Sequence, residues 1–218
     1  GSSALSAALK SGQSLKLYGL ENQDWDYSAY HLRVNDAAGM DFEVWIKDMD
    51  QETRLPVSLQ IPGEHNVLNA LAAFALADSL GIDREKIARS LGEFTGSGRR
   101  FEIRGEVDGV LLVDDYAHHP TEIQATLSAA RNAYPERFIR AVWQPHTFLR
   151  TKEFFDAFTR AFGDADHVLV TDIYAAREKG PAEFNGTKIV SAMDLPHVSF
   201  VPGFDEAVAH MAPQLGAG

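Results

Sequence analysis

The sequence predicts an α/β protein, with a Rossmann-like, mostly parallel sheet in its C-terminal part and antiparallel strands plus two helices before it. From residue 101 onward, short apolar segments alternate with amphipathic segments, which is the pattern of a parallel, doubly wound sheet. Before residue 62, apolar and polar residues alternate one by one, as in antiparallel strands with one face in water. The fold class therefore changes along the chain.

The N-terminal part is expected to begin as an antiparallel meander. Its four strands are expected at residues 15–20, 30–34, 42–46 and 55–61. Pro56 indicates an edge strand, because proline cannot donate a ladder hydrogen bond. The spacing of the apolar residues then changes from that of a strand to that of a helix, and helices are expected over residues 65–80 and 84–91. Gly81 suits the position just after the first helix, and Asp83 is a typical cap of the second.

Residues 94–98 hold two glycines and a serine and are expected to form a domain border. We therefore expect one domain over residues 4–94 and a second over residues 95–218, and we assign residues 1–3 to an expression scar. Strands of the second domain are expected at residues 101–107, 110–113, 138–143, 167–171, 188–190 and 198–201. Its helices are expected at residues 121–133, 151–162 and 204–211.

The composition excludes several functions. The net charge of −11, from 31 acidic and 20 basic residues, argues against nucleic acid and anionic membranes as main partners. The chain has no cysteine, so it offers neither disulfides nor thiolate chemistry. No apolar run approaches the ~20 residues of a membrane span. Because the sequence also shows no signal peptide, the expected location is the cytoplasm.

A polar stretch over residues 113–122 follows one buried strand and opens a helix at Pro120. Open α/β sheets bind their ligands at the carboxyl ends of strands. A helix N-terminus favours an anion, and Asp115 is suited to accept bonds from sugar hydroxyls. The alternative is that Asp114 or Asp115 caps the helix and that His118 and His119 are surface residues.

Two further groups suggest a nucleotide. Asn66 and Asn69 lie one turn apart near a helix start, where amides can read a purine edge, although a cap and a solvated position would explain them as well. Arg99 and Arg100 follow the glycines of the border and are suited to hold phosphate, although surface arginines are common. Residues 96–100 are not a dinucleotide fingerprint, because they follow a helix and lack a third glycine.

A second strand end, residues 144–152, carries His146, Arg150 and Lys152 towards the same sheet edge as Asp115 and His118. Arg150 is suited to bind a carboxylate. A third strand end carries polar residues 172–178. Each group taken alone is explained equally well by solvated side chains, but three polar strand ends at one edge favour a binding site.

Known catalytic motifs are absent from these 218 residues. No G-x-x-x-x-G-K-[ST] element is present, and the glycines at residues 180 and 186 have the wrong spacing for one. Neither H-E-x-x-H nor G-x-S-x-G occurs.

Five motifs, in this order and spacing, resemble the UDP-N-acetylmuramate–L-alanine ligases of the Mur ligase family. They are GEHNVLNA (63–70), GRRF (98–101), VDDYAHHPTE (113–122), QPH with RT (144–151) and DIYAARE (172–178). The resemblance implies a fragment of a three-domain enzyme. It identifies residues 4–94 as the second half of the central ATPase domain and residues 95–218 as the Rossmann-like C-terminal domain, and it implies that the fragment alone is inactive.

The resemblance also implies roles for single residues. His65, Asn66 and Asn69 would face adenine, Arg100 would contact the nucleotide, Asp115 would bind ribose, and Tyr116 would pack beside the base or the substrate. His118, His146 and Arg150 would bind the incoming amino acid. Some relatives have arginine where this chain has Thr147, which argues against a two-arginine clamp here. No catalytic residue and no metal ligand is assigned.

The implied reaction belongs to peptidoglycan synthesis. ATP, with Mg, would activate the carboxylate of UDP-N-acetylmuramate as an acyl phosphate, which the amine of L-alanine attacks. Two alternatives stay open: a murein-tripeptide recycling ligase, which shares the DDxxHHP element, and a non-catalytic nucleotide-binding or interaction module.

Overall fold

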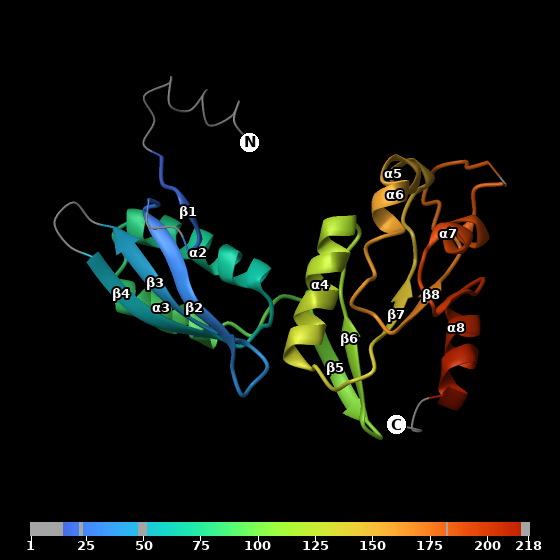
Figure 1. Ribbon diagram of the computed structural model, residues 1–218. Helices are drawn as coiled ribbons and strands as arrows, with labels where there is room; N and C mark the ends of the chain where they lie inside the picture. Colours follow the sequence, from blue (N-terminus) through green and yellow to red (C-terminus); the bar gives the residue numbers. More distant parts are fainter. Residues whose placement is uncertain (1–14, 22–23, 48–51, 182, 215–218) are drawn as a thin grey trace. The chain divides into compact units, whose positions relative to one another are not determined.

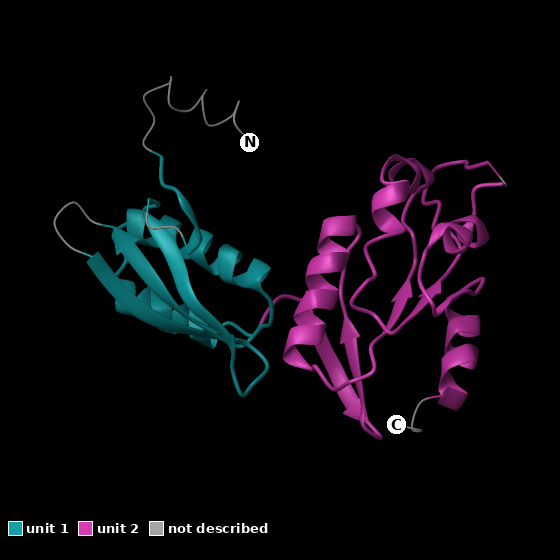
Figure 2. Cartoon of the chain, viewed as in Figure 1, with its two compact units in different colours: residues 1–95 teal, residues 96–218 magenta. Residues whose placement is uncertain are grey.

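The computed structural model describes residues 15–21, 24–47, 52–181 and 183–214. The chain forms two compact units, residues 1–95 and residues 96–218 (Figure 2). Each unit has its own hydrophobic core, and each is described here by itself. None of the helices in the described part of the chain is long and apolar enough to cross a bilayer.

Unit 1 contains a four-stranded sheet in the order β1-β2-β3-β4 (Figure 1). Its strands are β1 (Tyr18–Leu20), β2 (Tyr27–Val34), β3 (Met40–Lys47) and β4 (Glu52–Leu59). The pairs β2–β3 and β3–β4 are antiparallel, as expected, and Pro56 lies on the edge strand β4. The expectation of a fully antiparallel meander is wrong for β1, which runs parallel to β2. The Asp26 carboxylate fixes this arrangement, because it accepts the N–H of Leu17 at 2.8 Å just before β2 begins.

Two helices, α2 (Glu64–Ser79) and α3 (Arg84–Glu93), complete unit 1. Val67, Leu71 and Phe74 of α2 are fully buried in the core cluster that also contains Val44 and Ile46 of β3. The residues expected at the helix ends have the expected roles. Gly81 has a φ of +77°, and the Asp83 side chain accepts the N–H of Lys86 at 2.9 Å.

Unit 2 begins with an antiparallel hairpin and continues as a parallel sheet (Figure 1). The hairpin consists of β5 (Glu102–Val107) and β6 (Val110–Asp114), and the parallel strands are β7 (Arg140–Trp143), β8 (His167–Val170) and β9 (Val198–Phe200). The helices are α4 (Pro120–Ala133), α5 (Phe148–Glu153), α6 (Phe155–Phe158), α7 (Gly186–Ala192) and α8 (Phe204–Met211), followed by the short η1 (Ala212–Gln214).

The central strand β8 is apolar on both faces, as a buried parallel strand should be. Val168 and Val170 belong to the large core cluster, to which α4 and α7 contribute residues. Leu169, between them, packs instead with Val201 and with Ala207 of α8. Because successive side chains point to opposite faces of a strand, helices cover both faces of this sheet, as in a doubly wound fold.

Three expectations for unit 2 are corrected. The segment expected as a strand at residues 188–190 is part of helix α7, because the Asn185 side chain caps it by accepting the N–H of Lys188 at 3.1 Å. The strands expected at residues 101–107 and 110–113 pair antiparallel with each other and do not join the parallel strands. The helix expected at residues 151–162 starts earlier, at Phe148, and is interrupted at Phe154.

Candidate functional site

The candidate site of unit 2 lies where β6, β7 and β8 end. The loops after β7 and β8 pair with each other, because Thr147 donates its N–H to the Tyr174 carbonyl at 2.9 Å and Tyr174 donates its own to the Pro145 carbonyl at 2.8 Å. The loop after β6 reaches the same region, where the ring of His119 contacts Phe154 with centroids 4.7 Å apart. The structure thus brings the polar strand ends predicted from the sequence to one edge.

Asp115 braces the loop after β6. One carboxylate oxygen accepts the N–H of Phe101 at 2.8 Å, and the other accepts the N–H of Ala117 at 2.7 Å. Asp115 is not the cap of α4, since that position is occupied by His119, whose Nδ1 accepts the N–H of Thr121 at 3.3 Å. Each carboxylate oxygen keeps a second acceptor site for a ligand hydroxyl.

Glu122 organises the two histidines from the first turn of α4. Its carboxylate accepts the N–H groups of His118 and His119, and it lies 3.4 Å from Nδ1 of His118 and 3.8 Å from Nη1 of Arg100. Burial tends to raise the pKa of Glu122, but the His118 and His119 N–H groups and the positive charges of His118 and Arg100 outweigh it, so the pKa is lowered. An ionised Glu122 therefore holds His118 in place.

Tyr116 is an exposed ring between two polar neighbours. The guanidinium of Arg99 lies over it at 4.8 Å, and the ring of His118 lies 5.3 Å away. The N–H of Tyr116 donates to the Arg99 carbonyl at 2.8 Å, which ties residues 99–101 to the end of β6. A flat aromatic surface with a cation beside it is suited to stack against a planar ligand.

Arg150 and His146 follow β7. Arg150 lies in the last turn of α5 and is partly buried, and its side chain forms no ion pair or hydrogen bond with another residue of the described ranges. The Nδ1 of His146 is buried without a partner there, and the His146 ring packs on Tyr174 at 5.2 Å. Among the described residues, His118, His146 and Arg150 form no hydrogen bond, ion pair or ring contact with one another, so they lie at one edge but not in direct contact.

The other predicted nucleotide residues lie in unit 1, at the start of α2. Gly63, with a φ of +97°, turns the chain into this helix. Asn66 donates its side-chain N–H to the Pro62 carbonyl at 2.8 Å, and Asn69 donates to the Asn66 side chain at 3.4 Å. Asn69 is exposed, whereas Asn66 and His65 are partly buried. The Asn66 amide is therefore partly used to shape the helix start.

Comparison with known proteins assigns the family. Residues 99–218 match the family model described as Mur ligase, glutamate ligase domain.

The chain belongs to the Mur ligase family.

Individual relatives agree with this assignment. The chain is 43% identical over 193 residues to the UDP-N-acetylmuramate–L-alanine ligase of Caldanaerobacter subterraneus subsp. tengcongensis, covering 88% of this chain and 40% of the relative. It is 44% identical over 198 residues to the ligase of the same name from Acidithiobacillus ferrooxidans, covering 89% and 42%. This Mur ligase chain thus spans about 40% of the length of the curated relatives that it matches.

Solved structures show the same fold. The UDP-N-acetylmuramate–alanine ligase MurC from Thermotoga maritima superposes with a TM-score of 0.70 at 30% identity, covering 89% of this chain and 41% of that one. A murein peptide ligase from Psychrobacter arcticus superposes with a TM-score of 0.65 at 24% identity, covering 99% and 44%. The second likeness concerns the fold alone.

Membership of the Mur ligase family implies a bound Mg²⁺ ion, but the described residues do not form a metal site for it. Nowhere in the ranges that the structure describes do three or more His, Asp or Glu side chains gather as metal ligands.

Two residues of this edge were missed by sequence reasoning. Sequence reasoning included Glu122 only as the last residue of the polar stretch 113–122, although its carboxylate accepts the N–H groups of both histidines. Glu178 accepts the N–H of Leu149 at 3.0 Å and so joins the loop after β8 to the start of α5. A glutamate at the third position of a helix is a known capping signal, so the role of Glu122 could have been predicted. The role of Glu178 depends on a contact with Leu149, which is distant in the sequence, and no local pattern indicates it.

Proposed function

We propose that the chain is part of an ATP-dependent ligase that joins L-alanine to UDP-N-acetylmuramate, and that unit 2 binds the amino acid through His118, His146 and Arg150. The observation that carries this proposal is Arg150, a partly buried guanidinium with no ion-pair partner among the described residues. The chain has eleven more acidic than basic residues, so carboxylates are plentiful, yet none of those described neutralises Arg150. A substrate carboxylate would supply that partner.

The two histidines support the same role. His146 presents a buried Nδ1 that lacks a partner among the described residues, and a buried polar atom of this kind is stabilised by a ligand or a water molecule. His118 is held by Glu122 and by its own Nδ1 contact to the Tyr116 carbonyl at 3.0 Å. An imidazole at each of these places is suited to orient the amine of the amino acid, which must attack as a neutral nucleophile.

The reaction that we propose has two steps. The muramate carboxylate attacks the γ-phosphorus of ATP, which releases ADP and leaves an acyl phosphate. The amine nitrogen then attacks the acyl carbon, inorganic phosphate leaves, and the nitrogen loses a proton. Phosphoryl transfer needs a backbone cradle and a lysine. These 218 residues hold no G-x-x-x-x-G-K-[ST] element, so we propose that the chain alone turns over no ATP.

The test is steady-state kinetics of the full-length ligase with Arg150→Ala. Loss of a charge-assisted hydrogen bond costs about 1.5–3 kcal/mol, so the KM for L-alanine should rise about tenfold or more, with little change in the KM for ATP. Arg160→Ala is the matched control, because Arg160 is an exposed arginine downstream of α6. An unchanged KM for L-alanine in the Arg150 variant would refute the assignment.

A further inference from the structure

A hollow of about 510 Å³ lies at one end of unit 2, and residues on either side of Arg150 in the sequence contribute to its lining. Its lining comes from helix α5, from residues 178, 179, 181, 183 and 184, and from helix α7. Figure 1 shows where the two helices lie in unit 2. Its apolar lining includes Phe148, Leu149 and Phe184, and its basic lining is Lys152, Lys179 and Lys188. Neither His118, His146 nor Arg150 lines it, so the hollow is not the proposed amino-acid site.

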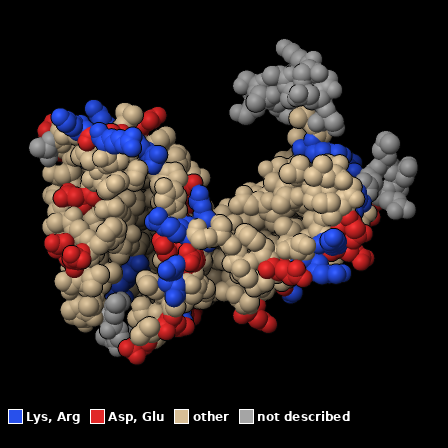
Figure 3. Space-filling model, turned by 180° about the vertical axis from the view of Figure 1, so that it is seen from behind, with Lys and Arg blue, Asp and Glu red and all other residues tan. Residues whose placement is uncertain are grey.

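The positive charge of this hollow is unusual for the chain. Three of the seven lysines of a protein with a net charge of −11 line one space. None of the three forms an ion pair with any side chain that the structure describes. Lys188 instead lies over the ring of Phe184 at 5.7 Å. Figure 3 shows Lys and Arg side chains gathered across this end of unit 2.

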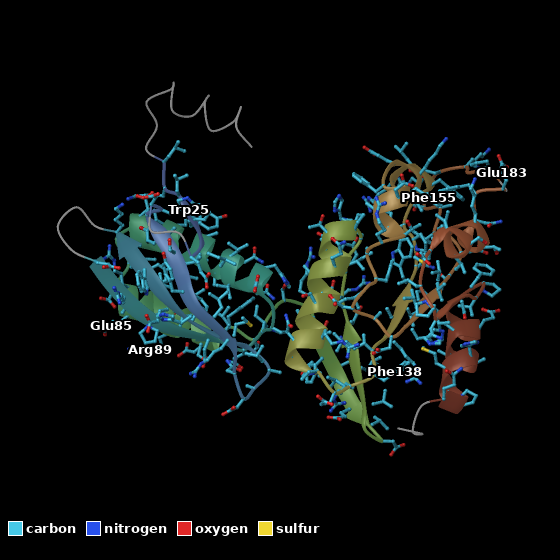
Figure 4. All side chains as sticks on the ribbon, in the orientation of Figure 1. Trp25, Glu85, Arg89, Phe138, Phe155 and Glu183 are labelled. Atoms are coloured by element: carbon cyan, nitrogen blue, oxygen red, sulfur yellow. The ribbon has the colours of Figure 1, made fainter. Side chains whose placement is uncertain are left out.

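Among the described residues, the two glutamates of the lining form no ion pair with the lysines. The Glu178 carboxylate is bound to the N–H of Leu149 at 3.0 Å and belongs to the wall. Glu183 is exposed and lies at the outer tip of the loop (Figure 4). The lining as a whole carries one more positive than negative charge.

The floor of the hollow is packed firmly. A Cβ at Gly180 would overlap the ring of Phe148, so the loop lies directly on this aromatic side chain. Phe184 is only 8% exposed, and its ring contacts that of Phe155 with centroids 5.7 Å apart. The core of unit 2 therefore holds the apolar part of the lining, while Lys152, Lys179 and Lys188 are exposed to solvent.

We propose that this hollow binds a phosphorylated small molecule with an apolar or aromatic body. A phosphate monoester carries close to two negative charges at neutral pH, which two or three ammonium groups can neutralise. The aromatic floor buries the apolar part of the ligand, as in most small-molecule sites. The site is separate from the proposed binding of L-alanine and does not depend on it.

The test is titration of this 218-residue chain, followed by ¹H–¹⁵N NMR, with 1-naphthyl phosphate, 1-naphthoate, 1-naphthol and inorganic phosphate as probes. We expect shifts at residues 148–152 and 178–188 and the tightest binding for 1-naphthyl phosphate. Naphthol lacks the phosphate group and inorganic phosphate lacks the aromatic ring, so each should bind at least about tenfold more weakly. Tighter binding of naphthoate than of naphthyl phosphate would overturn the phosphate assignment.

Charge removal makes the test specific. Lys152→Gln combined with Lys188→Gln should weaken naphthyl phosphate about tenfold or more, because two charge-assisted contacts are lost. Lys86→Gln is the control, since Lys86 is an exposed lysine on α3 of unit 1. These exposed substitutions should leave the spectrum of the free chain unchanged away from the hollow. Parent-like affinity in the double variant, or shifts outside the hollow, would overturn the proposal.

Discussion

The N–H of Phe101 donates to the Asp115 carboxylate at 2.8 Å, across fourteen residues of sequence. Phe101 is 7% exposed and has a φ of +45°, so a buried ring is held in a backbone conformation that L residues rarely adopt. The second Asp115 oxygen holds Ala117 at 2.7 Å. One carboxylate therefore fastens both the segment that enters β5 and the loop that leaves β6.

The first prediction is that Asp115→Ala destabilises unit 2. Its removal leaves two backbone N–H groups without their acceptor, which costs about 1–3 kcal/mol and corresponds to a Tm lower by about 2–10 °C. Asp114→Ala is the control, because among the described residues the Asp114 carboxylate forms only an exposed pair with Arg99 at 3.4 Å, worth about 0–1 kcal/mol. Thermal melts of the two variants that coincide with the parent would show that Asp115 does not act as a brace.

The second prediction is that Thr147→Gly stabilises the chain. Thr147 is β-branched and has a φ of +68°, where only glycine lies without strain. Relief of about 1–3 kcal/mol of strain should exceed the entropy that glycine adds to the unfolded state, for a net gain of about 1 kcal/mol. Thr159→Gly, at a φ of −63°, should lower the Tm instead. Melts in which both variants fall equally would contradict the strain argument.

The third prediction concerns acid stability. Burial tends to raise the pKa of Asp166, but the Ile139 N–H at 2.7 Å and Arg131 at 2.6 Å outweigh it and lower the pKa below 3.8. A lowered carboxyl pKa contributes stability above the unfolded value, and this is lost as the pH falls through the folded value. Asp166→Asn should be about 1 kcal/mol less stable at pH 7, since the carboxylate is partly exposed.

Urea melts of the Asp166→Asn variant and the parent at pH 7 and pH 3 measure this effect. The difference between the two proteins should shrink at the lower pH, because the parent carboxylate is then being protonated. A difference that is the same at both values would show that Asp166 acts through packing and not through its charge.

The fourth prediction concerns His167. Burial lowers the pKa of its imidazole below 6.5, and the positive charges of His210, Arg140 and His197 act in the same direction. The unfolded chain therefore takes up this proton at a higher pH than the folded chain, so stability falls as the pH falls below about 6.5. His167→Gln should make the Tm less dependent on pH between 7.5 and 5.5. An NMR titration that places His167 at or above 6.5 would contradict this.

Local signals in the sequence predicted much of the fold. Asp83 was expected to cap α3 and does so, and α8 spans residues 204–211 as expected. Where prediction failed, single side-chain hydrogen bonds to the backbone decide the structure. Residues 188–190 are apolar enough for a short strand, but the Asn185 cap makes them helical. The direction of β1 depends on Asp26, which the alternation of residues cannot reveal.

For the candidate site, too, one part could be predicted from the sequence and another could not. That polar residues after β7 and β8 lie at one edge follows from the parallel pairing of these strands. The loop after β6 belongs to the separate hairpin, and it reaches this edge through the contact between His119 and Phe154. The partners of those residues could not be predicted, because they are backbone groups of loops: Phe101 and Ala117 for Asp115, and His118 and His119 for Glu122. Every residue except proline has such a backbone N–H donor, so the residue types of the sequence do not reveal which ones a carboxylate binds.

The two hydrogen bonds between Tyr174 and the Pro145–Thr147 segment have a consequence for protein engineering. They continue the β7–β8 pairing beyond both strands, so residues 144–150 and 172–178 form one structural element made of two loops. Chimeras that replace one loop by that of another Mur ligase would break both bonds and displace its partner. Chimeras that exchange both loops together keep the backbone register, so a transplanted specificity can be tested without first losing the fold.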